Sequence, residues 1–116
     1  METIRIMAQA FYGNRVITEI KPENIDRFIL GYLNNTISVT EDIDRTIVRV
    51  PDTESLVIVY NKNRESMHQE YSPLAVISEE NLEIHSRCIA CKIDGDGNLQ
   101  SLEPEDVSVI TKYFTM

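Results

Sequence analysis

The sequence predicts a single α+β domain, in which one mostly antiparallel sheet of about five or six strands has two helices packed on one face. Short β-branched runs occupy much of the chain, and two segments instead place apolar residues at helical spacing. Polar turns separate most of the strand-like runs, as in hairpins, which argues against a doubly wound parallel sheet. The chain of 116 residues has the length of one domain, and we expect residues 1–116 to form it.

The first half of the chain predicts a hairpin, a helix and three strands. Residues 3–10 and 15–20 flank a turn at Tyr12-Gly13-Asn14. From Pro22 the period becomes helical, and one face collects Ile25, Phe28, Ile29, Tyr32 and Leu33 before Asn34-Asn35 ends the helix. Three runs rich in β-branched residues then predict strands at 36–39, 46–50 and 56–60.

The second half predicts a further strand and a closing helix. Residues 64–72 are polar and predict a loop, whereas 72–77 fit a short helix or a short strand equally well. Residues 82–93 predict one strand, which the turn at 94–98 ends. The last helix is expected from Pro104 to about Tyr113, with Val107, Ile110 and Phe114 buried against the sheet.

The charge balance limits the classes of partner. A formal net charge of -8 with scattered Lys and Arg disfavours binding to a nucleic-acid duplex, which needs clustered cations. The acidity either confers solubility alone or forms a surface that imitates nucleic acid or meets a basic protein. The longest apolar run, 56–60, is far shorter than the roughly 20 residues of a membrane helix. The first residues lack the features of a secretory signal, so we expect a cytoplasmic protein with reduced cysteines.

Cys88 and Cys91 have the C-x-x-C spacing of redox pairs and zinc knuckles. Residues three apart in a strand point to opposite faces, so the two thiols should not converge. His85 and His68 are the plausible additional zinc ligands, but His85 alternates faces with the cysteines along the same strand. We therefore expect two small buried side chains that form no disulfide and bind no metal.

The segment from Asp94 to Asn98 imitates a calcium loop. Asp94, Asp96 and Asn98 place oxygen atoms at alternate positions, and Glu105 occupies the twelfth position of such a loop. Leu99 stands at the sixth position, where the sharp bend requires Gly, and a strand precedes the segment. We expect a Gly/Asp turn without metal, and these four residues are only weak candidate ligands.

No catalytic motif is present in the sequence. It contains no Gly-rich phosphate loop, no nucleophile elbow and no H-E-x-x-H motif. The acid pairs Glu79/Glu80 and Asp42/Asp44 lie in polar stretches and are expected to be solvated turns. Neither a catalytic residue nor a cofactor is therefore expected. The aromatic residues beside predicted turns either anchor a partner or cap the core, and we favour the core for Phe11, Tyr12, Tyr60 and Tyr71.

Several short motifs give the sequence a resemblance to one known group of proteins. They are Gly31-Tyr32-Leu33, Val57-Ile58-Val59-Tyr60-Asn61, Ser72-Pro73-Leu74, Ser101-Leu102-Glu103-Pro104-Glu105 and Tyr113-Phe114. Together they resemble a family of small uncharacterised domains carried by phages, plasmids and conjugative elements of Gram-positive bacteria. The family usually has a polar pair after Pro-Leu, whereas here Ala75-Val76 follows. Because these motifs are structural, the resemblance implies a genetic context and no catalytic residue.

The resemblance, the acidity and the lack of catalytic motifs lead to one functional expectation. The chain is expected to be a non-enzymatic interaction protein of a mobile genetic element, such as an inhibitor of a host defence protein that acts through an acidic surface. The alternative is a domain that binds a small ligand, such as a nucleotide, in a groove between helix and sheet. A hydrolase whose site is assembled from distant residues is a third class. The sequence does not specify an oligomeric state.

Overall fold

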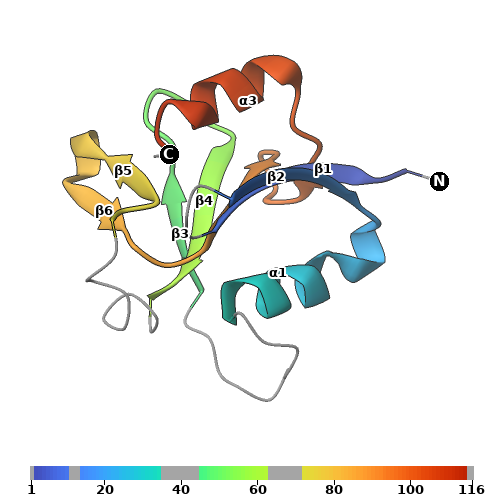
Figure 1. The fold of residues 1–116 in the computed structure, drawn as a ribbon. Helices are drawn as coiled ribbons and strands as arrows, with labels where there is room; N and C mark the ends of the chain where they lie inside the picture. The colour runs from blue at the N-terminus through green and yellow to red at the C-terminus, as the bar shows by residue number, and fades with distance from the viewer. Residues whose placement is uncertain (1, 11–13, 35–44, 63–71, 115–116) are drawn as a thin grey trace.

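The computed structural model describes residues 2–10, 14–34, 45–62 and 72–114, and Figure 1 shows the arrangement of their elements. The strands and helices follow the chain in the order β1 (Ile4–Ala10), β2 (Asn14–Ile20), η2 (Pro22–Asn24), α1 (Ile25–Asn34), β3 (Arg45–Arg49), β4 (Leu56–Asn61), β5 (Ala75–Ile77), η3 (Ser78–Glu80), β6 (Leu82–Ile84), β7 (Cys88–Ile93), β8 (Leu99–Gln100) and α3 (Pro104–Thr111).

The main sheet has six strands, and all its pairings are antiparallel. Its order is β2-β1-β7-β4-β3, with β8 paired to β7. Two hairpins, β1–β2 and β3–β4, flank the central strand β7, and β5 and β6 form a separate two-stranded sheet. The predicted α+β class and the mostly antiparallel sheet are therefore confirmed.

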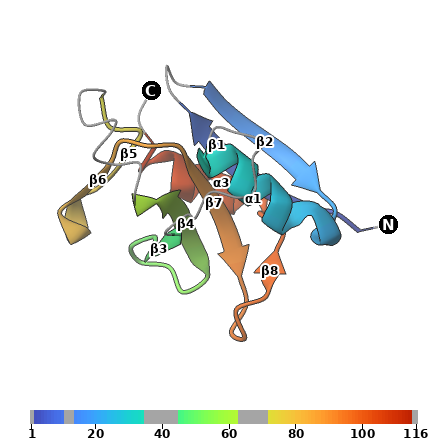
Figure 2. The same cartoon turned by 90° about the horizontal axis from the view of Figure 1, so that it is seen from below.

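The two helices lie on opposite faces of the main sheet, so the prediction that both pack on one face is wrong. α1 contributes Ile25, Ile29 and Leu33 to one core cluster, whereas α3 contributes Ile110 to another. Figures 1 and 2 show α1 and α3 on the two sides of the strands. The physical reason is that the central strands are apolar on both faces, and a strand of that kind requires cover on both sides.

Strand β7 shows how the two cores are separated. Cys88 and Ala90 face the α3 cluster, and Ile89 and Cys91 face the α1 cluster. The same alternation holds along β4, where all six residues are buried. The uninterrupted apolar run of β4 was therefore the sequence signal for two covered faces.

The predicted strand over residues 82–93 is wrong in its extent. It is divided into β6 and β7, which belong to different sheets and are connected by residues 85–87. The open choice at 72–77 resolves as a strand, β5, which pairs antiparallel with β6. The strand predicted at 36–39 and nearly all of the loop predicted at 64–72 lie outside the described residues.

The helix faces agree closely with their apolar periodicity. In α1, Ile25, Ile29 and Leu33 are buried, and Phe28 and Tyr32 pack against the same cluster. After α3, Phe114 is buried along with Ile110, whereas Val107 is only partly buried. A capping box begins α3: Asp106 Oδ2 accepts a hydrogen bond of 2.8 Å from the Glu103 N–H, and the Glu103 side chain accepts one in return.

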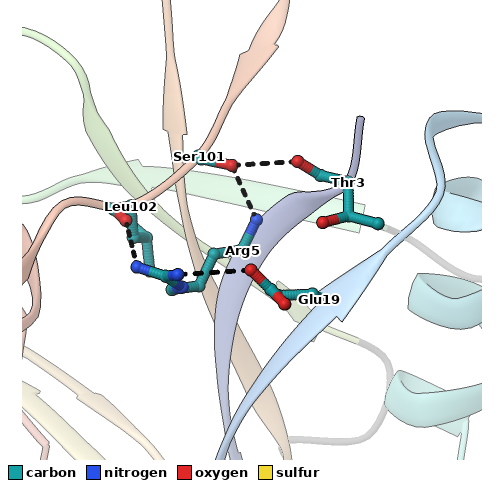
Figure 3. A network of polar contacts seen from close by, with 5 residues as sticks. All are labelled: Thr3, Arg5, Glu19, Ser101 and Leu102. Carbon is teal, nitrogen blue, oxygen red and sulfur yellow. Dashed lines mark hydrogen bonds and ion pairs between the residues drawn. The ribbon is translucent and has the colours of Figure 1, made fainter. Parts of the chain in front are cut away.

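A polar network fixes the chain before α3 to strand β1 (Figure 3). The Arg5 backbone N–H donates to Ser101 Oγ at 3.0 Å, and that hydroxyl donates to the Thr3 carbonyl at 3.2 Å. The Arg5 guanidinium donates to the Leu102 carbonyl at 3.4 Å and to Glu19 at 3.2 Å on β2. These contacts hold the start of α3 against the hairpin. Across the described parts of the chain, neither helix is long and apolar enough to cross a membrane.

Candidate functional site

An open apolar groove lies beside α1, on the sheet face that this helix covers. Its volume is about 360 Å³. Val57, Val59, Cys91 and Ile93 of β4 and β7 line it, together with Ile29 of α1 and Ile47 of β3. We call this the α1 groove.

The groove exists because α1 does not extend over the edge of the sheet. α1 packs over β4 and β7, and β3 lies beyond them as the edge strand. Ile47 pairs with Val59 and so points to the α1 face, where 63% of its surface is exposed. A large apolar side chain thus stands open beside a buried apolar floor.

The charges at the groove are few. Asp26 is the charged side chain among the described residues that line it, and it lies in the first turn of α1. A carboxylate in that position is stabilised by the positive end of the helix dipole. Burial raises the pKa of the Cys91 thiol to about 11, so the thiol stays protonated and acts as part of the apolar lining. The thiol in the described lining is therefore not an ionised nucleophile at neutral pH.

An acidic surface lies on the other face, at the β5–β6 hairpin. It consists of exposed Asp52, Glu79, Glu80 and Glu83. The Tyr113 hydroxyl donates to Glu79 Oε2 at 3.3 Å. Desolvation raises the pKa of Tyr113, and the negative charges of Glu79 and Asp52 raise it further. Carboxylates from η3 and from the β3–β4 turn thus both raise the pKa of the same tyrosine.

The same hairpin is hollowed beside its acids. An open, mostly polar hollow of about 500 Å³ is lined by Val76, Ser78, Asn81, Leu82, Glu83 and His85. His85 is largely buried, and its Nε2 lies 3.7 Å from Glu83 Oε1. The hollow gives the acidic surface a concave region.

The weak calcium candidates form a turn between β7 and β8. Asp94 Oδ1 accepts hydrogen bonds from the backbone N–H groups of Asp96 and Asn98, each at 2.9 Å, and Oδ2 accepts from Gln100 at 3.3 Å. The backbone hydrogen bond from Asn98 is the main cause of the lowered pKa of Asp94. Glu105 lies separately, in the first turn of α3. In residues 2–10, 14–34, 45–62 and 72–114, no three His, Cys, Asp or Glu side chains group to hold a metal ion.

The other residues that the sequence singled out are distributed across the molecule. Cys88 and Cys91 face opposite core clusters, as strand geometry predicted, and His85 precedes β7 instead of lying within it. Tyr60 is buried in the core, which confirms the prediction made for it. Glu79 and Glu80 are exposed in η3. Outside the described residues lie Phe11, Tyr12, Asp42, Asp44, His68 and Tyr71.

A contact between two partly buried polar side chains on the α1 face was not predicted from the sequence. The Arg87 guanidinium lies 5.0 Å from the centroid of the Tyr32 ring, a cation–π contact. The Tyr32 hydroxyl and Arg87 Nε are both buried, and neither has a hydrogen-bond partner in the structure. Burial raises the pKa of Tyr32 to about 12, although the charge of Arg87 opposes that rise. No sequence pattern links these residues, because their contact depends on α1 packing over the start of β7.

No protein-family model, curated protein or solved structure matches this chain. The structure by itself defines an α+β domain with an apolar groove on one face and an acidic surface on the other.

Proposed function

We propose that this protein is a non-enzymatic binding domain whose partner is a basic protein. The observation that carries the proposal is the α1 groove, in which exposed Ile47 adjoins a floor of Val57 and Val59. Binding sites are typically concave and mostly apolar, with a few polar groups that set specificity. The net charge of -8 supports a partner of opposite charge.

The groove and the acids take different parts in this interaction. Apolar side chains of the partner enter the groove, where they gain free energy from burial against Ile47 and the floor. A basic group of the partner pairs with Asp26 at the rim. The remaining acids, including the acidic surface, raise the association rate by long-range attraction, which salt screens.

The biological setting of the proposal rests on the resemblance to domains of mobile genetic elements. A protein of such an element acts inside a host cell, so the partner we propose is a host protein, and a defence protein is the specific case. Neither the groove nor the acidic surface requires catalysis for that role, because an inhibitor acts by occupying its target.

Quantitative capture from host lysate tests the proposal. Immobilised wild-type protein should retain a basic protein, and retention should fall as ionic strength rises. Ile47→Glu should reduce retention at least tenfold, because it places a charge at the mouth of an apolar groove, and Asp26→Asn should weaken it less. Glu105→Gln removes an exposed charge on α3, away from the groove, and should retain the partner. Equal capture by Ile47→Glu and wild type would contradict the role of the groove.

The size of the groove supports a second candidate, the binding of a small ligand. A volume of about 360 Å³ is within the range of small-molecule pockets. The apolar lining and Asp26 suit an apolar or cationic ligand better than the phosphates of a nucleotide. A protein-free lysate extract that raises the melting temperature of wild type, but not of Ile47→Glu, would favour this candidate. If only the protein fraction has that effect, the first candidate stands.

A further inference from the structure

The outer edge of β2 exposes apolar side chains beside backbone that has no strand partner. β2 pairs with β1 along all seven of its residues and, within the described parts of the chain, with no other strand. Val16 and Ile17 are each 50% exposed. Figure 2 shows β2 at the border of the sheet. Edges of this kind readily pair with another strand.

Backbone geometry restricts how β2 can pair with itself. In an antiparallel ladder the N–H and C=O groups of successive residues point alternately toward one neighbour and toward the other. When two residues lie opposite each other, the backbone N–H and C=O groups of both must point toward the other strand, or those of both must point away from it. A twofold β2–β2 pairing must therefore place one residue opposite its own copy, and Val16, Ile17 and Thr18 are the central choices.

Charge selects Ile17 among these three. With Ile17 at the centre, Arg15 of one copy lies opposite Glu19 of the other, and all seven residues of the strand pair. A pairing centred on Thr18 would bring Arg15 opposite Lys21, which has the same charge. A pairing centred on Val16 would leave Glu19 and Ile20 without a partner in the other β2.

The opposite edge of the sheet lacks this complementarity. β3 also exposes an apolar residue, Ile47, but a twofold pairing about it would place Arg45 opposite Arg49. A contact between β2 of one copy and β3 of another would be head-to-tail and would leave free edges for continued growth. Of these three pairings between described edge strands, the β2–β2 pairing both closes and matches charge.

We propose that two copies of this protein associate through β2, in antiparallel register, with Ile17 on the twofold axis. The pairing joins the two main sheets edge to edge and covers Val16 and Ile17 of both copies. The α1 groove opens toward β3, at the other edge of the sheet, and so stays accessible in the dimer.

Disulfide trapping tests the register directly. Opposed residues in an antiparallel pair have Cα atoms about 4.5–5.5 Å apart, which a disulfide can bridge. Ile17→Cys should therefore form a covalent dimer under mild oxidation. Val16→Cys is the matched control: position 16 is equally exposed, but its two copies would lie on a diagonal about 7–8 Å apart, too far for a disulfide. The native Cys88 and Cys91 are buried and do not compete.

Ile17→Cys should cross-link at least tenfold more than Val16→Cys and than Ile47→Cys on the other edge. Equal cross-linking at positions 16 and 17, or none at 17, would overturn the proposal. Sedimentation equilibrium gives an independent measurement without oxidation. Wild type should dimerise, Ile17→Lys should weaken dimerisation at least tenfold, and Ile47→Lys should leave it unchanged. Monomeric wild type at the highest soluble concentration, or an unaffected Ile17→Lys, would also overturn it.

Discussion

The α3 face of the sheet is more completely covered than the α1 face. The α3 face is covered by the helix, by residues of the β5–β6 sheet and by Phe114, which together bury Ile58 and Tyr60. Lys92 on this face forms an ion pair of 3.1 Å with Asp106 of α3. On the α1 face, as far as the described residues go, α1 packs over the centre of the sheet with the α1 groove beside it.

Under the proposed function, the two faces of the sheet serve different purposes. Closed packing of the α3 face supplies stability, because deleting a side chain from a closely packed core leaves a cavity. Incomplete cover of the α1 face leaves apolar surface available to another molecule.

The largest expected effect is the loss of stability caused by Ile110→Ala, which Ile29→Ala on the other face should not match. Ile110 is fully buried in the α3 cluster, so its truncation should leave a sealed cavity and reduce the free energy of unfolding by about 4 kcal/mol. Ile29 lines the groove, so its truncation widens an open space and should cost only about 2 kcal/mol. Chemical denaturation followed by circular dichroism measures both. An equal or larger cost for Ile29→Ala would show that the α1 face is packed as closely as the other.

Phe114→Ala should destabilise by about 3 kcal/mol, slightly less than Ile110→Ala because the residue lies near the chain end. Phe114 is 5% exposed, its backbone bridges to Ala75, and the Arg15 guanidinium lies 5.5 Å from its ring centroid. Tyr113→Phe is the neighbouring control, since it removes only an exposed hydroxyl contact with Glu79. A change of only a few tenths of a kcal/mol for Phe114→Ala would mean that this residue does not close the α3 face.

Alkaline pH should destabilise the α1 face through Cys91. Burial raises the pKa of this thiol from 9.0 to about 11, so the folded state holds its proton at pH values where the unfolded state has lost it. The contribution of this thiol to the free energy of unfolding is complete below pH 9. It is lost as pH rises toward 11, by about 1.4 kcal/mol per pH unit. Burial also raises the pKa of Tyr32, to about 12, so its hydroxyl causes a further loss of stability at higher pH. Denaturation midpoints between pH 8 and pH 11 should therefore fall more steeply for wild type than for Cys91→Ala. Parallel curves would contradict the burial of this thiol.

The smallest expected effect is that of calcium on the turn between β7 and β8, which borders the groove through Gly97. Asp94 already accepts hydrogen bonds from Asp96, Asn98 and Gln100, so its carboxylate is engaged in the turn. Thermal melts with millimolar calcium and with chelator should coincide. A calcium-dependent rise in melting temperature that Asp96→Ala abolishes would identify this turn as a metal site.

Much of the local structure could be predicted from the sequence. The hairpin β1–β2 follows from apolar alternation on both sides of a turn, and the faces of α1 and α3 follow from helical spacing. The opposite orientation of Cys88 and Cys91 follows from their odd separation in one strand. Each of these features depends on residues close together in the chain.

Other features depended on contacts between distant segments. The segment from Leu82 to Ile93 contains no Gly or Pro, yet it divides at residues 85–87. Ile84 pairs with Ala75 and Cys88 pairs with Tyr60, in different sheets. The groove was expected only in general terms, as a space between helix and sheet. Its position depends on which strands α1 covers, and Ile47 gives no sign of its exposure in the sequence.

The sequence by itself determined the first hairpin, the strands β3 and β4, the helix faces and the acidity of this protein, because period, turn chemistry and charge act over a few residues. Tertiary structure decided the side on which each helix packs. β2 and β3 lie at opposite edges of the sheet, so the chain between them must cross one face, and α1 does so. Leu102 enters the core of the other face and directs α3 there. The strand order arises because β7 pairs with β1 and β4, which lie much earlier in the sequence. This order decided which apolar surface of the sheet was left uncovered.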